Sequence, residues 1–436
     1  MSEKGLLFLV AGIWVFIFLI QKQYRRNLLV ISILGFIVGW HGLNISPGFV
    51  IYPTELLIWF GFLIYLLSRK NRRSDVRPPK PTFWEIALAL LAVTGGFTAL
   101  IYNHPLFNDL AFLKSFLVFI PMLVLFRGWI SNKQQIVFFA RTLVYAGTII
   151  SILGLMERYI PAISTLFSNF IPVSMETRYN FGFDSFVNLA AFSFWGTPVV
   201  SVLLVLFTGL AVFLPKPNIR WQKIIWFLTP PLLTLAIIST GYRSAWLGLI
   251  VVIVLGVVFN PGQSLPWLVL AIPVSFVLFS SAFIDRLKTV FYLPAFQDPT
   301  FITRYSALQN GLQTIKDNLL LGVGWGSPTT FNDWVNLGVA IGGIGLMVFA
   351  IWYGLLLINL LKYARKTMEK DNYFLCMSFF TALGGYSIAM FSGAMSQVFP
   401  IMTGFWFIFC LGWRLIEISR EEEVINGKVV SATSNI

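Results

Sequence analysis

The sequence has very little charge. Only 11% of its 436 residues are Asp, Glu, Lys or Arg, and 57% are hydrophobic, whereas a soluble domain typically has about 25% charged residues. This scarcity excludes an ordinary soluble globular protein. The charge that is present is mostly positive, with a formal net charge of +13. In so apolar a chain this excess indicates basic loops on the cytoplasmic side of a membrane, and we expect no nucleic-acid partner.

Cysteine and histidine are also scarce. Cys376 and Cys410 both lie in apolar runs, which excludes a disulfide framework, and His41 and His104 have no companion ligand pattern. We therefore expect no metal site and no cofactor. The first apolar run, residues 5–20, lacks a small-residue cleavage site and is followed by basic residues. It reads as a retained span and not as a cleaved signal peptide.

Long apolar runs fill nearly the whole chain. We count about thirteen runs of roughly 16 to 23 residues, a length that spans a bilayer core of about 30 Å as helix. The expected fold is therefore an all-α, polytopic transmembrane helix bundle of about 12 to 13 spans. The first expected spans cover 27–43, 50–68, 83–102 and 112–126, with an external loop at 103–111.

We divide the chain by this pattern into four segments. Residues 1–284 should hold about ten spans with short loops, 285–339 an extracytoplasmic loop with an amphipathic helix, 340–415 three more spans, and 416–436 a disordered cytoplasmic tail. Basic residues are concentrated between Arg69 and Lys80. By the positive-inside rule, the loop 69–82 should be cytoplasmic and the segment 285–339 should lie outside.

The external segment contains an expected helix that starts at a cap on Thr303. Its apolar stripe has spacings of three and four residues and comprises Tyr305, Leu308, Leu312, Ile315 and Leu319. Arg304 is expected on the opposite, polar face. The helix is followed by Gly322, Gly324 and Gly326, whose lack of a Cβ permits unusual backbone geometry. Such a helix and loop suit a polar site at a membrane surface.

Two arginines on the expected outer side are candidates for binding phosphate. Arg243 lies in a turn between two short apolar runs, 224–238 and 245–259, which rise only about 23 Å as helix, so the turn can be recessed into the bilayer. Arg304 begins the external helix. Guanidinium groups match phosphate geometry, although Arg243 could instead snorkel and Arg304 could be a solvated helix residue. Arg178 is a weaker candidate of the same kind.

Asp333 is the acidic candidate. It precedes the next apolar run and could act as a base on a hydroxyl, or it could simply cap the following helix. Capping is the simpler interpretation of its position, and the residues alone leave both roles open.

These motifs together resemble the O-antigen ligase and O-antigen polymerase-like membrane proteins. The resemblance lies in Ser239 to Leu249 (STGYRSAWLGL), in Arg304 followed by Gly311 to Gly324 (GLQTIKDNLLLGVG), in Phe331 to Val335 (FNDWV), and in Gly342 and Gly345, with a weaker similarity at Gly182-Phe183 and Asn188 to Ala190. The motifs cover roughly the second half of the chain.

The resemblance implies an inverting, metal-independent glycosyltransferase of the bacterial inner membrane. Its donor would be a glycan on undecaprenyl diphosphate, its acceptor another glycan or a lipid, and its active site would face outward among membrane lipid. By this analogy Arg243 and Arg304 would hold the diphosphate, Tyr242 and Arg178 would contribute to substrate binding, and Asp333 would be catalytic.

One departure separates this chain from the ligases of that family. They place a histidine before the Asn of the Asn332 motif and often an acid further on, where this chain has Phe331 and Ala340. A polymerase, a ligase with another base and a non-catalytic partner of a polysaccharide export complex remain open. So does a transporter of small anions such as inorganic carbon, for which Glu55 and the pair Pro230-Pro231 are the best candidate features in the spans.

Overall fold

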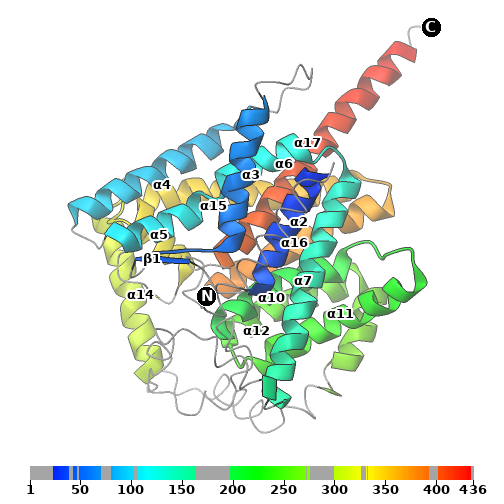
Figure 1. The fold of residues 1–436 in the computed structure, drawn as a ribbon, viewed down its shortest axis with the longest axis horizontal. Helices are drawn as coiled ribbons and strands as arrows, with labels where there is room; N and C mark the ends of the chain where they lie inside the picture. Colours follow the sequence, from blue (N-terminus) through cyan, green and yellow to red (C-terminus); the bar gives the residue numbers. More distant parts are fainter. Residues whose placement is uncertain are drawn as a thin grey trace, which may run out of the picture.

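The chain folds into a bundle of long helices with one small β-hairpin (Figure 1). The computed structural model describes residues 23–38, 43–46, 49–69, 80–102, 106–160, 162–163, 197–271, 273–274, 299–325, 330, 332–391 and 401–433. Its elements are α2 (Tyr24–Val38), β1 (Leu43–Ser46), β2 (Phe49–Ile51), α3 (Pro53–Arg69), α4 (Phe83–Ile101), α5 (Leu106–Leu117), α6 (Phe119–Trp129), α7 (Lys133–Tyr159), α10 (Thr197–Phe213), α11 (Arg220–Ser239), α12 (Arg243–Phe259), α14 (Pro299–Asp317), α15 (Asp333–Lys366), α16 (Lys370–Phe391) and α17 (Ile401–Thr433).

The bundle is a multi-pass membrane protein, as the sequence predicted. Among the described residues, seven helical segments are long and apolar enough to cross a membrane. They are Phe83–Ile101, Leu110–Trp129, Lys133–Glu157, Arg220–Ser239, Asp333–Lys366, Lys370–Phe391 and Ile401–Val424, and three shorter apolar helices accompany them at Pro53–Ser68, Val200–Phe213 and Arg243–Phe259. The all-α fold class is confirmed. The expected spans at 5–20 and, in large part, 265–284 lie outside the described residues.

Two early boundaries differ from the expectation. Residues expected at the ends of two spans form the antiparallel hairpin β1–β2, in which Leu43 pairs with Ile51 and Asn44 with Val50. The expected loop 103–111 is helical from Leu106 onward. Hydropathy measures how apolar a run is. It therefore does not distinguish a strand from the end of a helix, and it does not show where a helix begins.

Small residues bring the central helices into close contact. A Cβ on Gly209 of α10 would lie 2.3 Å from the Cα of Ala382 on α16, and one on Gly248 of α12 would lie 2.7 Å from the carbonyl oxygen of Gly385. The backbones of α10, α12 and α16 therefore approach as closely as membrane helices do at small-residue interfaces. This packing anchors the start of α12, where Arg243 lies.

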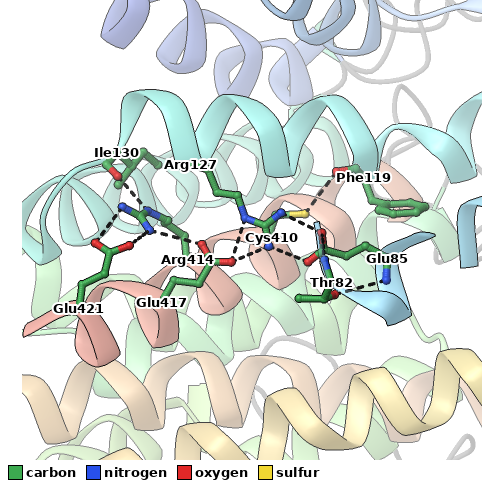
Figure 2. Close-up of polar contacts among 9 residues, drawn as sticks. All are labelled: Thr82, Glu85, Phe119, Arg127, Ile130, Cys410, Arg414, Glu417 and Glu421. Atoms are coloured by element: carbon green, nitrogen blue, oxygen red, sulfur yellow. Dashed lines mark hydrogen bonds and ion pairs between the residues drawn. The ribbon is translucent and has the colours of Figure 1, made fainter. Parts of the chain in front are cut away.

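A buried ion-pair network joins α4, α6 and α17, and we call it the arginine clamp (Figure 2). Arg127 of α6 donates two parallel bonds to Glu85 of α4, of 2.8 and 2.6 Å, and further bonds to Glu417 of α17. Arg414 of α17 donates to the carbonyl of Ile130 at 3.0 Å and to Glu421 at 2.9 Å. Three helices far apart in sequence are thus held at one point.

The arginine clamp also explains why the C-terminal segment is not as expected. The segment 416–436 was expected to be a disordered tail, but α17 continues without a break from Ile401 to Thr433. Arg414 bonds Glu417 and Glu421, one and two turns further along α17, and such pairs on one face stabilise a helix. In Figure 1 this helix projects beyond the bundle, whereas α14 lies at the opposite end.

Candidate functional site

The turn between α11 and α12 is built by its own short polar side chains. The hydroxyls of Ser239 and Thr240 donate to the carbonyls of Ala236 and Ile237, at 2.8 and 2.6 Å, where α11 ends and its last carbonyls lack helical partners. Gly241 then takes a φ of +67°, which a glycine adopts without strain. The chain can therefore reverse in three residues, so that α12 begins at Arg243.

Asn332, and not Asp333, caps helix α15. Its side chain accepts from the N–H of Val335 at 3.1 Å and donates to the carbonyl of Phe391 at 3.1 Å. Asp333 is the first residue of the helix and is only 3% exposed. The capping interpretation of Asp333 is therefore wrong in this structure, and an acid in the first helical turn is favoured by the helix dipole.

A polar loop holds the start of α15 in place. The side-chain oxygen of Asn336 accepts from the N–H of Thr330 at 2.6 Å, and its amide donates to the carbonyl of Thr330 at 3.0 Å. The hydroxyl of Thr330 accepts from the N–H of Asn332 at 3.2 Å. Thr330 and Asn336 are both buried. Asp333 is thus fixed between two hydrogen-bonded anchors.

Helix α15 is broken at Gly342, and the glycine loop fills the break. Gly342 has φ +78° and ψ 169°, a conformation that is essentially restricted to glycine. The carbonyls of Val339 and Ala340, released by the break, accept from the N–H groups of Val323 at 2.9 Å and Gly324 at 3.2 Å. An unsatisfied backbone group in lipid costs several kcal/mol. The hydrogen bonds from Val323 and Gly324 remove this cost for two carbonyls, so the helix can tolerate the break.

Helix α14 begins at Pro299, earlier than the expected cap at Thr303. Proline suits the first turn because its fixed φ matches a helix and its missing N–H would have no partner there. The helix docks on α15 through Gly311, where a Cβ would lie 2.4 Å from Thr330 and 2.7 Å from Val335. Only glycine permits so close an approach.

The expected faces of α14 are found only in part. Ile315 and Leu319 of the expected apolar stripe lie against Gly338 and Gly343 of α15, and Arg304 is exposed, as expected for the polar face. Tyr305 and Leu312 of the stripe are about half exposed, while Gly311 contacts α15. Hydropathy did not reveal that a glycine contributes to the docking side.

Charged groups on α14 and α15 both interact electrostatically with the hydroxyl of Tyr242. Tyr242 precedes α12 and is half-buried as a side chain. Burial of its hydroxyl, together with the nearby carboxylate of Asp333, raises the pKa of Tyr242 to about 12, against the opposing influence of a hydrogen bond with Ser244 and the charge of Arg304. The phenol is therefore protonated at neutral pH. A cation and a carboxylate from two other elements both act on this one hydroxyl.

Three of the five sequence candidates, Tyr242, Arg304 and Asp333, interact electrostatically, and Arg243 follows Tyr242 in the chain. We call Tyr242, Arg243, Arg304 and Asp333 the site cluster. Arg243 is the first residue of α12 and half-buried, and Arg304 is exposed. Arg178 and Phe331 lie outside the described residues.

Sequence reasoning missed the residues that position Asp333. Asn336 and Thr330 gave no signal in the sequence because a buried amide and a hydroxyl acquire their roles only from the loop that they bridge. Ala340, which takes the place of a family acid, lies at the helix break, where its carbonyl accepts from Gly324.

Taken together, the structure is a multi-pass helical bundle in which arginines, a tyrosine and a buried carboxylate lie at or near the starts of α12, α14 and α15, a combination of groups that can bind an anion. Residues 231–350 match the family model described as O-antigen ligase. This part of the chain is therefore similar to that family. The match includes Tyr242, Arg243, Arg304 and Asp333. A comparison with curated proteins gave no match.

Proposed function

We propose that this protein transfers a glycan from undecaprenyl diphosphate to another glycan or lipid, with inversion at the anomeric carbon and without a metal ion. The observation that carries the proposal is the Tyr242 hydroxyl, on which both Arg304 and Asp333 act electrostatically. A glycosyl donor with a diphosphate leaving group needs a cation for the leaving group and a base for the acceptor. Arg304 can supply the cation and Asp333 the base, and both act on the hydroxyl of Tyr242.

The reaction follows from these groups. The acceptor hydroxyl attacks the anomeric carbon and passes its proton to the Asp333 carboxylate as the new C–O bond forms. The bond from the anomeric carbon to the diphosphate oxygen breaks, and the lipid diphosphate leaves with one more negative charge. Arg304 and Arg243 stabilise that charge through paired donors, and Tyr242 remains a neutral donor for a phosphate oxygen.

We further propose that the site cluster faces the outside of the bacterial inner membrane. In support, α14 and the projecting part of α17 lie at opposite ends of the bundle (Figure 1), and basic residues gather at Lys362 to Lys370 beside α17. Ser306→Cys on α14 and Glu369→Cys beyond α15 test this in a chain without Cys376 and Cys410. An impermeant thiol reagent on intact cells should modify only the first, and the reverse pattern would move the site to the wrong side.

The two features considered for a transporter do not form an open coordination site. The carboxylate of Glu55, 2% exposed, forms an ion pair with Lys114 and accepts from the hydroxyl of Ser115 at 2.6 Å. The pair Pro230-Pro231 lies inside α11, which continues as helix from Arg220 to Ser239. A transporter coordinates its substrate with unpaired groups or with the ends of broken helices, so neither feature favours transport.

The decisive experiment is turnover by purified protein in liposomes. With an oligosaccharide on undecaprenyl diphosphate and an acceptor glycan, we expect release of the lipid diphosphate and transfer of the sugar, in the presence of a chelator as well. Analysis of the product linkage tests inversion. No transfer with any such donor, together with bicarbonate flux across the same liposomes, would replace the enzyme with a transporter.

A further inference from the structure

Tyr386 of α16 has a buried hydroxyl that the reaction described above does not use. The side chain is completely buried, and among the residues that the structure describes its hydroxyl has no hydrogen-bond partner. Its ring stacks on Phe405 of α17, with ring centroids 4.9 Å apart and planes 18° apart. Because a buried hydroxyl without a partner is destabilising, phenylalanine would be the better residue for packing alone.

Tyr386 lies beside a small cavity near the first turn of α15, where Asn332 donates to the carbonyl of Phe391 on α16. Tyr386 lines this cavity with Leu337, Met390 and Phe405, among other apolar side chains. Leu337 lies four residues after Asp333 on α15, so both project from one face of that helix, one turn apart. The cavity has room for about one water molecule. Tyr386 and Trp406 supply the polar atoms of this largely apolar lining.

The carboxylate of Asp333 acts electrostatically on the hydroxyl of Tyr386. It also acts on Tyr242, which lies on the turn before α12 and which Arg304 of α14 faces as well. The groups that interact electrostatically with Asp333 therefore include Tyr242 from the turn and Tyr386 from α16.

We infer that Tyr386 is a positioning residue for Asp333, and that its hydroxyl donates to the Asp333 carboxylate through one water molecule. The inference rests on the proposed function, in which Asp333 is the base. A donor on the buried side stabilises the ionised carboxylate and orients it. The carboxylate thereby keeps its outward oxygen toward the acceptor hydroxyl. This role explains why a phenol stands where packing alone favours phenylalanine.

Tyr386→Phe tests the inference, with Tyr353→Phe as a matched control. Tyr353 is also buried in this aromatic cluster, but its hydroxyl lies 2.7 Å from the carbonyl of Leu383 and 2.6 Å from the hydroxyl of Ser387. The primary readout is the titration of Asp333 in the purified protein by infrared difference spectroscopy, with Asp333→Asn identifying the band. This readout does not depend on turnover.

For Tyr386→Phe we expect the Asp333 pKa to rise by about 0.5 to 1 unit, because the ionised form loses a donor. Below the wild-type pKa, turnover should then fall about three- to tenfold and recover at higher pH. The melting temperature should not fall. Tyr353→Phe should show the opposite pattern, a lower melting temperature and an unchanged Asp333 titration.

An Asp333 titration that is the same in Tyr386→Phe and wild type would overturn the inference. So would a titration that Tyr353→Phe moves equally. If the wild type transfers no glycan but the titration moves as expected, the proposed function fails and the contact between Tyr386 and Asp333 stands. If the wild type is active and the titration does not move, only the inference about Tyr386 fails.

Discussion

The arginine clamp and the site cluster are both polar groups in an apolar bundle, but they differ in accessibility. The clamp sets Arg127 and Arg414 against three glutamates, with direct bonds of 2.5 to 3.5 Å throughout. The site cluster contains two arginines and one carboxylate, Asp333. The clamp is a buried, saturated network of ion pairs, whereas the site cluster reaches the surface through the exposed Arg304.

Burial separates the two clusters in the same way. The side chains of Arg127 and Glu85 are only 5% and 6% exposed, whereas Arg304 is exposed and Arg243 and Tyr242 are half-buried. A saturated, buried network holds helices together but leaves no group for a ligand. A partly accessible cluster that contains two arginines can bind an anion. The comparison teaches that the arginines of interest for ligand binding in a membrane protein are those that stay accessible.

The largest expected effect lies in the clamp. Arg127→Ala would leave Glu85 and Glu417 buried without their cation, so the free energy of unfolding should fall by about 3 to 5 kcal/mol. Unfolding in detergent measures it. Lys366→Ala is the control, because Lys366 and Glu423 are 3.9 Å apart and both more than half exposed; it should change stability by at most about 1 kcal/mol. An equal loss of stability in Arg127→Ala and Lys366→Ala would contradict the distinction between buried, saturated charges and accessible ones.

The next largest effect concerns activity. Asp333→Asn should lower kcat at least about 100-fold, the loss expected for a general base, while its melting temperature stays near that of the wild type. Asp317→Asn is the control, since Asp317 lies exposed on α14 and accepts from Gln313 at 2.9 Å. Full turnover in Asp333→Asn would show that the buried acid serves only structure, like the clamp.

The helix break provides a third test. Gly342→Ala places a Cβ 2.8 Å from the carbonyl oxygens of Leu319 and Leu320 at a φ of +78°, and should cost about 1 to 3 kcal/mol. Gly354 lies on the same helix with nothing within 4 Å of such a Cβ, so Gly354→Ala should be neutral or stabilise by up to about 1 kcal/mol. Unfolding in detergent compares the two. A harmless Gly342→Ala would mean that α15 runs unbroken past the site.

The smallest effect is on diphosphate binding. Arg243→Lys and Arg304→Lys keep the charge but lose the paired donors, so each should lower activity at least about tenfold with expression unchanged. Arg365→Lys, at the exposed end of α15, should leave turnover as it is. Initial rates with the lipid-linked donor measure all three. Wild-type rates in both Arg243→Lys and Arg304→Lys would show that these arginines, like those of the clamp, do not bind the diphosphate through paired donors.

The sequence alone predicted the membrane class and most of the spans that the structure describes. Apolar runs report lipid burial directly, because the bilayer sets both their length and their composition. The turn motif from Ser239 to Arg243 was equally readable, since hydroxyls and a glycine close a tight turn locally. Such features depend on neighbours a few residues away, which the sequence contains in full.

Only the tertiary structure decided how these residues are used. The face of α14 that docks depends on Gly311 meeting Thr330, and the break in α15 depends on the loop that supplies Val323 and Gly324 to its carbonyls. The clamp partner of Arg127 is 290 residues away in sequence. These contacts join distant segments through shape and hydrogen-bond satisfaction, and periodicity along the chain contains no record of which segments will meet.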